Sequence, residues 1–571
     1  MGGNSILAIQ VSHRMSKTLG VDVRVADIFK YKTISGLLSQ GLGHGRIEIP
    51  KLDTDRSVLS FAQERLWFIE QYEGGTNAYH IPQVYEVSEY ADLEGLSYAI
   101  NQVVSRHEVL RSTIELGADE KGIQIVHSEA LLIEEKVLRT AEILEGVLRE
   151  DINRPFDLSS EYPIRVKIYR INTEGERERV LLLINLHHIV SDGWSMEIFQ
   201  KELLDYYGAY LRGDKLFSLA PLDIQYKDYS LWQRSYLSGE VLANQLSYWK
   251  KKLTGYSTLE LPTDYVRPTQ IDYRGGSEVF TLGNEISEKV RLLSRQYGVT
   301  VHSVLLSAMN VLLSKYTGQE DIVIGSPMAN RHHRQTEGLI GFFVNSQVNR
   351  ALLSKTQSYE ELIQEVHRDQ ISGQAYQDLP FEKLVDELGV NRDTSRHPIF
   401  QVMFGVQSFG KEASGVEEKG HLMPYPGLTT YEVEKFDLSI FVDDRQELLM
   451  GRIGYASSLF KKETITRLIG HYLYLLEQLV ESPQTPYSKI SLLLPSEYKQ
   501  IVYDWNATDK DYPSEKTLQE LFAEQVLRTP DKVALVYEDN YLSYRDLDEK
   551  SNQLARHIRR RYNEQTGQEL V

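Results

Sequence analysis

The stretch that decides the fold is Val180-Leu-Leu-Leu-Ile-Asn-Leu186, which runs directly into His187-His188-Ile-Val-Ser-Asp192-Gly193-Trp194-Ser195. Its first part is almost wholly apolar, as is typical of a β-strand covered on both faces. Further on, Met196, Phe199 and Leu203 recur at the spacing of one helix face, so a helix is expected there. The sequence therefore predicts a mixed α/β fold with two histidines at the end of an interior strand.

These histidines are candidates for chemistry because a strand end holds side chains rigidly and can point them into a cleft. A neutral imidazole there can accept a proton from an amine or hydroxyl that attacks a carbonyl group. Gly193 would let backbone and substrate approach closely, and Asp192 would either orient a histidine or pair with an arginine. Two other interpretations stay open: hydrogen-bonded core histidines, and a metal site formed by His187, His188 and Asp192.

Composition narrows the classes of function. The chain has 571 residues, which at about 150 residues per domain suggests roughly three to four domains. Its 81 acidic and 63 basic residues give a formal net charge of −18, which disfavours nucleic acid and anionic membranes as partners. Cysteine is absent, which excludes disulfides, thiolate metal sites and a cysteine nucleophile. No apolar run approaches about 18 residues and no secretory signal is visible, so we predict a cytoplasmic protein.

The chain divides into five segments that differ in composition and in predicted secondary structure. Residues 1–40 read as small helices, beginning with one from Ser5 that Gly20 can close, and they are too short to form a core alone. The end of the chain predicts a helix, a strand and a second helix, which also cannot close a domain. The expected boundaries are 1–40, a partial helical domain; 41–56, a linker; 57–482, a large mixed domain; 483–512, a second linker; and 513–571, the start of a further domain.

At His187 to Gly193 the sequence resembles the condensation domains of nonribosomal peptide synthetases, whose signature is His-His-x-x-x-Asp-Gly. Six further blocks of that family occur in the right order. They are Leu59-Ser-Phe-Ala-Gln-Glu-Arg-Leu-Trp67, Arg106-His-Glu-Val-Leu-Arg111, Tyr226-Lys-Asp-Tyr-Ser-Leu-Trp232, Ile340-Gly-Phe-Phe-Val-Asn345, Tyr376-Gln-Asp-Leu-Pro-Phe-Glu382 and Arg392-Asp-Thr-Ser-Arg-His-Pro-Ile-Phe-Gln401. Any one block is weak evidence, but together and in order they are highly specific.

The flanking segments agree with this resemblance. Gly2-Gly3-Asn4-Ser5 is similar to the peptidyl carrier motif whose serine accepts phosphopantetheine, and a phosphate there would lie at a helix N-terminus. The plain alternative is a glycine-flanked helix cap. The tail from about Thr517 resembles the start of an adenylation domain. That family's phosphate-gripping loop and catalytic lysine would lie beyond Val571, so we expect no amino-acid activation by this chain.

The resemblance implies a chloramphenicol-acetyltransferase-like fold of two lobes in a V shape with a central tunnel. The N lobe would span about 57–225 and the C lobe about 226–482. Two carrier domains would bring thioesters to opposite faces, and the acceptor amine would attack the donor carbonyl to form a peptide bond. The implied cofactor is 4'-phosphopantetheine, on Ser5 and on partner carriers, and the implied partners include an adjacent adenylation domain. A CoA-dependent acyltransferase and a non-catalytic carrier-docking domain are the alternatives.

The resemblance also assigns roles to residues. His188 would position or deprotonate the amine, with His187 in a structural role. Asp192 would form an ion pair with Arg331. Gly193 would line the constriction with Trp194 and Ser195 behind it, and Asn345 and Ser346 would form the tunnel floor. The sequence Ser-Asp-Gly-Trp-Ser at residues 191–195 is similar to that of the class of condensation domains that joins two L-configured residues.

Overall fold

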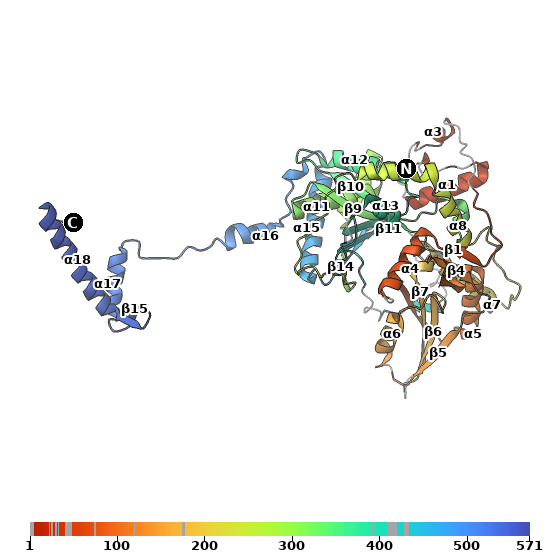
Figure 1. Cartoon of the computed structure of the whole chain (residues 1–571), viewed down its shortest axis with the longest axis horizontal. Helices are drawn as coiled ribbons and strands as arrows, with labels where there is room; N and C mark the ends of the chain where they lie inside the picture. Colours follow the sequence, from red (N-terminus) through yellow and green to blue (C-terminus); the bar gives the residue numbers. More distant parts are fainter. Residues whose placement is uncertain are drawn as a thin grey trace. The chain divides into compact units, whose positions relative to one another are not determined.

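The computed structural model describes residues 5–21, 23, 27–28, 31, 33–39, 48–73, 76–118, 120–140, 142–173, 177–390, 393–407, 420–426 and 433–570. The chain forms two compact units, Met1–Leu494 and Pro495–Val571. The first unit contains two lobes, each built on its own β-sheet (Figure 1).

The N lobe is built on a five-stranded sheet with the order β12-β2-β7-β6-β5. The strands are β2 (His80–Val87), β5 (Ile133–Leu138), β6 (Ile164–Ile171), β7 (Arg179–His187) and β12 (Leu422–Pro424). Strand β7 is central and antiparallel to β2 and β6, which places His187 opposite His80. The predicted interior strand is confirmed as β7, because the side chains from Leu181 to His187 are buried.

Helices and a small sheet complete the N lobe. The helices are α4 (Phe61–Glu73), α5 (Leu93–Arg106), α6 (Leu144–Asn153) and α7 (Gly193–Leu211), with the 3-10 turn η1 (Glu108–Arg111). A three-stranded sheet has the order β1-β4-β3, from β1 (Arg56–Val58), β3 (Ser112–Leu116) and β4 (Gly122–Val126). Helices α5 and α7 pack so closely that a Cβ on Gly95 would lie 2.5 Å from the Tyr210 ring. This packing anchors α7, the helix that follows the two histidines.

The C lobe is built on a six-stranded sheet with the order β10-β9-β11-β13-β14-β8. The strands are β8 (Gly275–Thr281), β9 (Asp321–Met328), β10 (Asn345–Leu352), β11 (Val402–Gln407), β13 (Leu438–Asp443) and β14 (Met450–Ala456). The helices are α9 (Gly239–Lys252), α10 (Asn284–Tyr297), α11 (Val301–Thr317), α12 (Tyr359–Gln374), α13 (Phe381–Leu388) and α15 (Lys462–Glu481), with the turns η3 (Arg334–Thr336) and η4 (Tyr487–Lys489). A separate apolar cluster packs α9 and α13 against β9 and β10.

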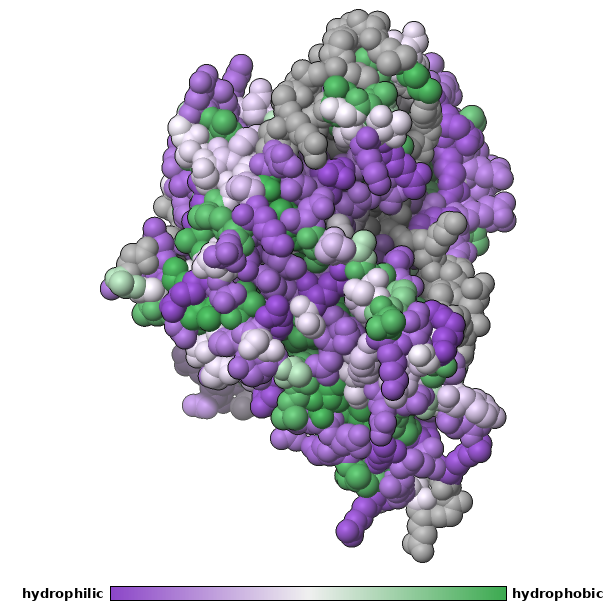
Figure 2. Space-filling view, turned by 90° about the vertical axis from the view of Figure 1, so that its right-hand side faces the viewer, coloured by the Kyte–Doolittle hydropathy of each residue, from purple (hydrophilic) through white to green (hydrophobic). Residues whose placement is uncertain are grey.

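Helix α11 forms the centre of the C-lobe core, since its residues from Ser303 to Ser314 are all buried. Within the described ranges no single helix has the length and hydropathy to cross a membrane. Helices α10 and α11 meet that threshold only as a pair, bent by 110° at their junction. On the face drawn in Figure 2, hydrophilic residues predominate and the apolar residues form scattered patches.

The lobe boundaries differ from the expected ones. Helix α8 (Tyr226–Tyr236) packs beside β1, and its Tyr226 and Tyr229 belong to the N-lobe core, although the division is expected at residues 225/226. Strand β12, far along the chain, pairs with β2 and so completes the N-lobe sheet. Residues 483–494, expected in a linker, pack with the C lobe, because Tyr487 and Ile490 are buried in its core.

The N-terminal segment packs on the same unit through helix α1 (Ser5–Leu19), with a shorter helix α3 (Ile34–Ser39) following. Gly20 ends α1 as predicted, in a left-handed conformation with φ of 67°. The first part of the expected linker, residues 41–47, lies outside the described residues. The later part of this linker packs on the first unit through Ile49, which is buried. The backbone N–H of Ile49 donates to the side-chain oxygen of Gln335, and its carbonyl accepts from the Gln335 side-chain amide.

The second unit is small. It contains α16 (Pro495–Lys499), a π-helical turn at Gln500–Asp504, α17 (Leu518–Arg528), the hairpin strands β15 (Val533–Tyr537) and β16 (Asn540–Ser543), and α18 (Tyr544–Thr566). The predicted helix, strand and helix are confirmed. The last helix starts at Tyr544, because Ser543 and Asp546 form its capping box.

Candidate active site

The two histidines lie where β7 ends and a single 3-10 turn, η2 (His188–Val190), leads into α7. The Asp192 carboxylate caps α7 by accepting a hydrogen bond from the Ser195 backbone N–H at 2.8 Å. The cap fixes the first turn of the helix, and the sheet fixes the end of the strand. The five residues between His187 and Gly193 are therefore held from both sides.

His188 is half-buried, and a protein partner for its side chain is found at one of the two ring nitrogens. Its Nδ1 lies 2.9 Å from the Ser191 carbonyl oxygen. A carbonyl only accepts, so Nδ1 carries the proton and the lone pair of the neutral ring is on Nε2. Burial, aided by the positive charge of Lys435, lowers the pKa of His188 well below its ordinary value. The imidazole is thus neutral at neutral pH and can accept a proton at Nε2.

His187 has the opposite arrangement. It is fully buried, its Nδ1 accepts the Ile189 backbone N–H at 3.1 Å, and its Nε2 donates to Glu70 of α4 at 3.1 Å. Both ring nitrogens are therefore occupied by protein groups. Burial lowers the pKa of His187 although the Glu70 carboxylate opposes this shift. The contacts agree with the structural role that the resemblance implies for His187.

Asp192 and Arg331 form the ion pair that the resemblance implies. Arg331 Nη2 lies 3.2 Å from Asp192 Oδ1, and both side chains are fully buried. The other carboxylate oxygen accepts the Phe343 backbone N–H at 3.0 Å. Arg331 also donates to the carbonyls of Thr336 and Leu339, each at 2.7 Å. This network ties the histidine loop to the segment before β10, so Asp192 contacts the scaffold and not the imidazole.

Ser195 belongs to the same network. Its hydroxyl donates to the Gly341 carbonyl at 2.8 Å and accepts from Arg331 Nη2 at 2.7 Å. The three candidate metal ligands therefore bind different partners. His187 is hydrogen-bonded to Glu70, His188 to the Ser191 carbonyl, and Asp192 to Arg331. Among the described residues, no group of three or more histidine and carboxylate side chains is placed to hold a metal ion.

A cavity of about 1640 Å³ lies beside this loop and is lined from both lobes. His188, Gly193 and Trp194 contribute from the N lobe. A Cβ on Gly193 would meet no atom within 4 Å, so the space that a side chain would fill belongs to the cavity. Trp194 donates its indole N–H to the Glu337 carbonyl at 3.1 Å. Trp194, which the resemblance places behind Gly193, thus lines the cavity beside it, whereas Ser195 is fully buried.

Asn345 does not line this cavity, in contrast to the expectation that it forms the floor. Its amide donates to the carbonyls of Gln377 and Leu379, and its oxygen accepts from the backbone of Ser346 and Phe381. All its hydrogen-bonding capacity thus serves to fix the segment before α13. Ser346, the next residue, does line the cavity.

Sequence reasoning missed several cavity residues. Arg65 of α4 donates to Glu382 of α13 at 2.6 Å, which joins the two lobes across the cavity. Tyr79, before β2, accepts the His188 backbone N–H on its carbonyl at 2.7 Å, and its ring lies 4.4 Å from the Lys435 ammonium. Arg65 and Glu382 stand in recognised blocks, but their pairing across more than 300 positions has no local signal. No sequence signal indicates that Lys435 lies in the cavity.

Helix α1 packs at the edge of the same cavity. Ala8 and Ile9 are buried against Trp194, and Ile9 itself lines the cavity. His13 contacts Glu337 Oε2 at 3.1 Å through Nδ1. Ser5 is the first residue of α1, so a phosphate attached to it would meet the unsatisfied N–H groups of the helix start. That position fits a phosphopantetheine group, although the Ser5 side chain lies outside the described atoms.

Comparison with known proteins decides the family. A model of the condensation-domain family matches residues 54–502. The chain belongs to the condensation-domain family. Residues 1–39 match the phosphopantetheine attachment site, which identifies the N-terminal segment as part of a carrier domain.

Among curated relatives, gramicidin S synthase 2 of Aneurinibacillus migulanus is 34% identical over 98% of the chain. Bacitracin synthase 3 of Bacillus licheniformis is 33% identical over 98%, and tyrocidine synthase 3 of Brevibacillus parabrevis is 32% identical over 98%. The chain spans only 12%, 9% and 8% of the length of these three relatives. Their full length therefore holds much more than the segment matched by this chain.

Solved structures share the fold. The condensation domain superposes on the X-domain in its complex with OxyB from teicoplanin biosynthesis with a TM-score of 0.70, at 25% identity over 79% of this chain and 99% of that one. A four-domain nonribosomal peptide synthetase bound to AMP and glycine gives a TM-score of 0.75, at 21% identity over 90% of this chain and 39% of that one. The expected fold of two α/β lobes is therefore confirmed.

Proposed function

We propose that this condensation domain forms peptide bonds in nonribosomal peptide synthesis. It transfers an aminoacyl or peptidyl group from the thioester on an upstream carrier to the α-amine of an aminoacyl thioester on a downstream carrier. The observation that carries the proposal is the neutral His188, whose Nδ1 is bound to the Ser191 carbonyl and which lines a cavity large enough for both reactants.

The proposed reaction needs alignment more than activation, because a thioester is already reactive. Holding the two reactants in line can equal an effective molarity of about 10⁵–10⁸ M. The amine nitrogen attacks the thioester carbonyl carbon, a C–N bond forms, and the carbonyl electron pair moves onto oxygen. His188 Nε2 takes a proton from the amine. The oxyanion then collapses, the C–S bond breaks, and the leaving thiolate receives a proton from His188.

Carrier domains are the proposed partners. Phosphopantetheine on Ser5 would supply the thiol that holds the donor as a thioester, and the packing of α1 beside Trp194 brings this carrier segment to the cavity. We further propose that the tunnel opens at both faces and that both joined residues are L-configured. The neighbouring adenylation domain and the cytoplasmic location stay predictions of the sequence.

The test uses separate carrier domains loaded with alanine as donor and acceptor, mixed with the chain. Mass spectrometry of the acceptor carrier should show dipeptide only when the chain is present. His188→Ala should lower the rate by about 10²–10⁴-fold, as for loss of a proton-transferring group, with an unchanged melting temperature. His188→Ala with full activity would refute the role of His188.

The same assay separates the alternatives. Transfer from a soluble acyl-CoA at the rate of the carrier-bound donor would favour a CoA-dependent acyltransferase. Carrier binding without any dipeptide would favour a docking domain. An acceptor dipeptide with an L-donor but none with a D-donor would support the L-to-L assignment, and the reverse preference would overturn it.

A further inference from the structure

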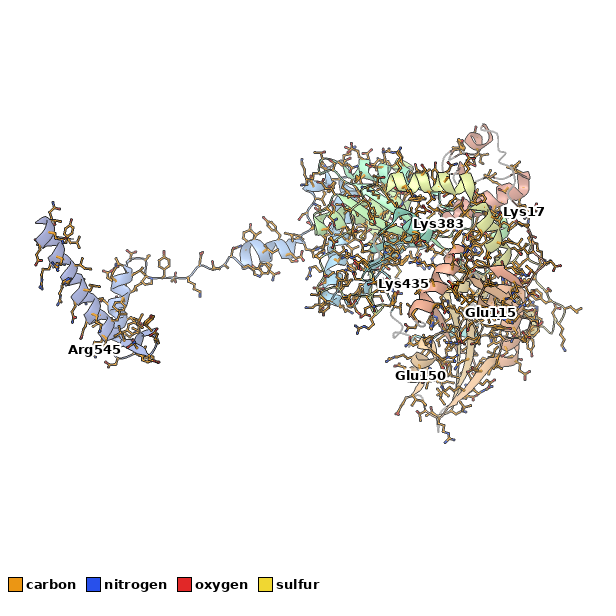
Figure 3. All side chains as sticks on the ribbon, in the orientation of Figure 1. Lys17, Glu115, Glu150, Lys383, Lys435 and Arg545 are labelled. Carbon is orange, nitrogen blue, oxygen red and sulfur yellow. The ribbon has the colours of Figure 1, made fainter. Side chains whose placement is uncertain are left out.

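The cavity contains a lysine that forms no ion pair with a carboxylate among the described residues. Lys435 lies just before β13 and lines the cavity, and Figure 3 labels it between the two lobes. Its Nζ is 4.4 Å from the centre of the Tyr79 ring, which attracts cations without neutralising them. Within the described part of the chain no ion pair forms to Lys435.

Nearby charged groups have other partners. The Oε1 of the neighbouring Glu434 accepts hydrogen bonds from the Ser439 hydroxyl and from the backbone N–H groups of Lys435 and Phe436. Arg65 is bound to Glu382. Lys435 is half-buried, so its ammonium is partly removed from water, and a negative charge that forms on a ligand in the cavity would be attracted to it.

The position of Lys435 connects it with the reacting centre. The ring of Tyr79 forms a cation–π contact with the Lys435 ammonium. The backbone carbonyl of the same residue accepts a hydrogen bond from the His188 backbone N–H. After burial, the charge of Lys435 is the largest cause that lowers the pKa of His188. The lysine and the imidazole therefore face the same part of the cavity from opposite lobes.

We propose that the Lys435 ammonium stabilises the oxyanion that forms when the amine attacks the thioester carbonyl. This inference rests on the proposed function. During the attack, the carbonyl electron pair moves onto oxygen while the proton leaves toward His188. A cation on the C-lobe side would face that oxygen while His188 faces the amine from the N-lobe side. Removal of one such preorganised group typically costs about 10²–10³-fold in rate.

The pH dependence of the reaction rate separates a catalytic lysine from a merely structural one, because only a lysine that acts through its charge would make the rate follow its own titration. Burial lowers the pKa of Lys435 to about 8, with Glu434 opposing and Arg65 assisting the shift. The titratable and charged groups that face it are Glu434, Arg65, Tyr79 and His188. Because the charged form acts, its contribution is full well below pH 8, is half of that near pH 8 and is lost as the pH rises further. A guanidinium at this position would stay charged.

The experiment measures single-turnover dipeptide formation between alanyl carriers for the wild type, Lys435→Met, Lys435→Arg and the control Lys250→Met. Lys250 carries the same charge but is exposed outside the cavity, where it pairs with Glu387. We expect Lys435→Met to be about 10²-fold slower at saturating acceptor carrier, with half-saturation unchanged. Lys435→Arg should regain at least tenfold of that loss and should keep its rate above pH 8, where the wild type declines. Lys250→Met should stay within twofold of the wild type.

Two results would overturn the proposal: a Lys435→Met rate equal to that of the wild type, or a loss confined to half-saturation. The second result would assign Lys435 to carrier binding and not to the reacting carbonyl. If Lys435→Met does not fold, Lys435→Gln and the pH profile of Lys435→Arg decide the question. Dipeptide formation by the wild type tests the proposed function separately, since that reaction can proceed while the lysine variants show no effect.

Discussion

Substitution of Asp192 should harm the fold before it harms the chemistry. In Asp192→Ala, Arg331 keeps its full charge in a site with no solvent exposure and loses its carboxylate partner. Removing one member of a buried ion pair typically costs about 3–5 kcal/mol in the free energy of unfolding. The Ser195 and Phe343 backbone N–H groups also lose their acceptor, and the lost N-cap of α7 adds about 1 kcal/mol. The total approaches the whole stability of an ordinary domain, about 5–15 kcal/mol.

The assay is urea unfolding followed by tryptophan fluorescence, together with the yield of soluble protein. Asp205→Ala on the same helix is the matched control, because Asp205 forms an exposed pair with Lys201 that contributes at most about 1 kcal/mol. Asp192→Ala should lower the unfolding midpoint strongly and the control should leave it nearly unchanged. The double variant Asp192→Ala/Arg331→Met should be less destabilised than the sum of the single variants, because it leaves no charge without a partner.

One outcome would refute this reasoning. If Asp192→Ala is as stable as the Asp205→Ala control but forms no dipeptide, Asp192 takes part in the reaction directly. The contacts with Arg331, Ser195 and Phe343 would then be incidental to its role.

Three further predictions concern the cavity and its edge. Gly193→Leu should lower dipeptide formation by at least tenfold while its melting temperature stays close to that of the wild type, because the added Cβ meets no atom within 4 Å and the side chain extends into the cavity; a normal rate would show that substrates do not pass Gly193. Ile9→Asp should release α1 from Trp194, since a buried apolar contact is replaced by a charge; faster hydrogen exchange of the α1 amides would support this, and unchanged protection would contradict it. The His188 imidazole should remain neutral when the pH is lowered through 6.5, because burial and Lys435 lower its pKa; an NMR titration with His188→Ala for assignment checks this, and a midpoint at or above 6.5 would be inconsistent with the observed environment.

The local part of the site could be predicted from the sequence. An apolar run followed by turn residues and a helix-capping aspartate defines β7, η2 and α7 through neighbours in the chain. The pairing of Asp192 with Arg331, 139 positions apart, has no such local signal. Only the family resemblance predicts it, because the resemblance supplies information about distant contacts that periodicity does not contain.

Elements that depend on the tertiary fold alone are missed or misplaced by sequence reasoning. The three residues of β12 have no strand pattern of their own, and only the open edge of β2 makes them a strand. The expected lobe division places Tyr226 at the start of the C lobe, yet its ring packs in the N-lobe core. Asn345 is expected to face the cavity, but the carbonyls of Gln377 and Leu379 orient its amide away. In each case a partner distant in sequence determines the outcome.

The most direct test is a crystal structure of the chain with an alanyl-pantetheine amide, a stable thioester mimic, soaked into the cavity. We predict that the α-amine of the analogue lies within about 3.2 Å of His188 Nε2, since a group that accepts its proton must be within hydrogen-bond reach. An analogue bound in the cavity with its amine turned away from His188, or bound only outside the cavity, would contradict the central claim.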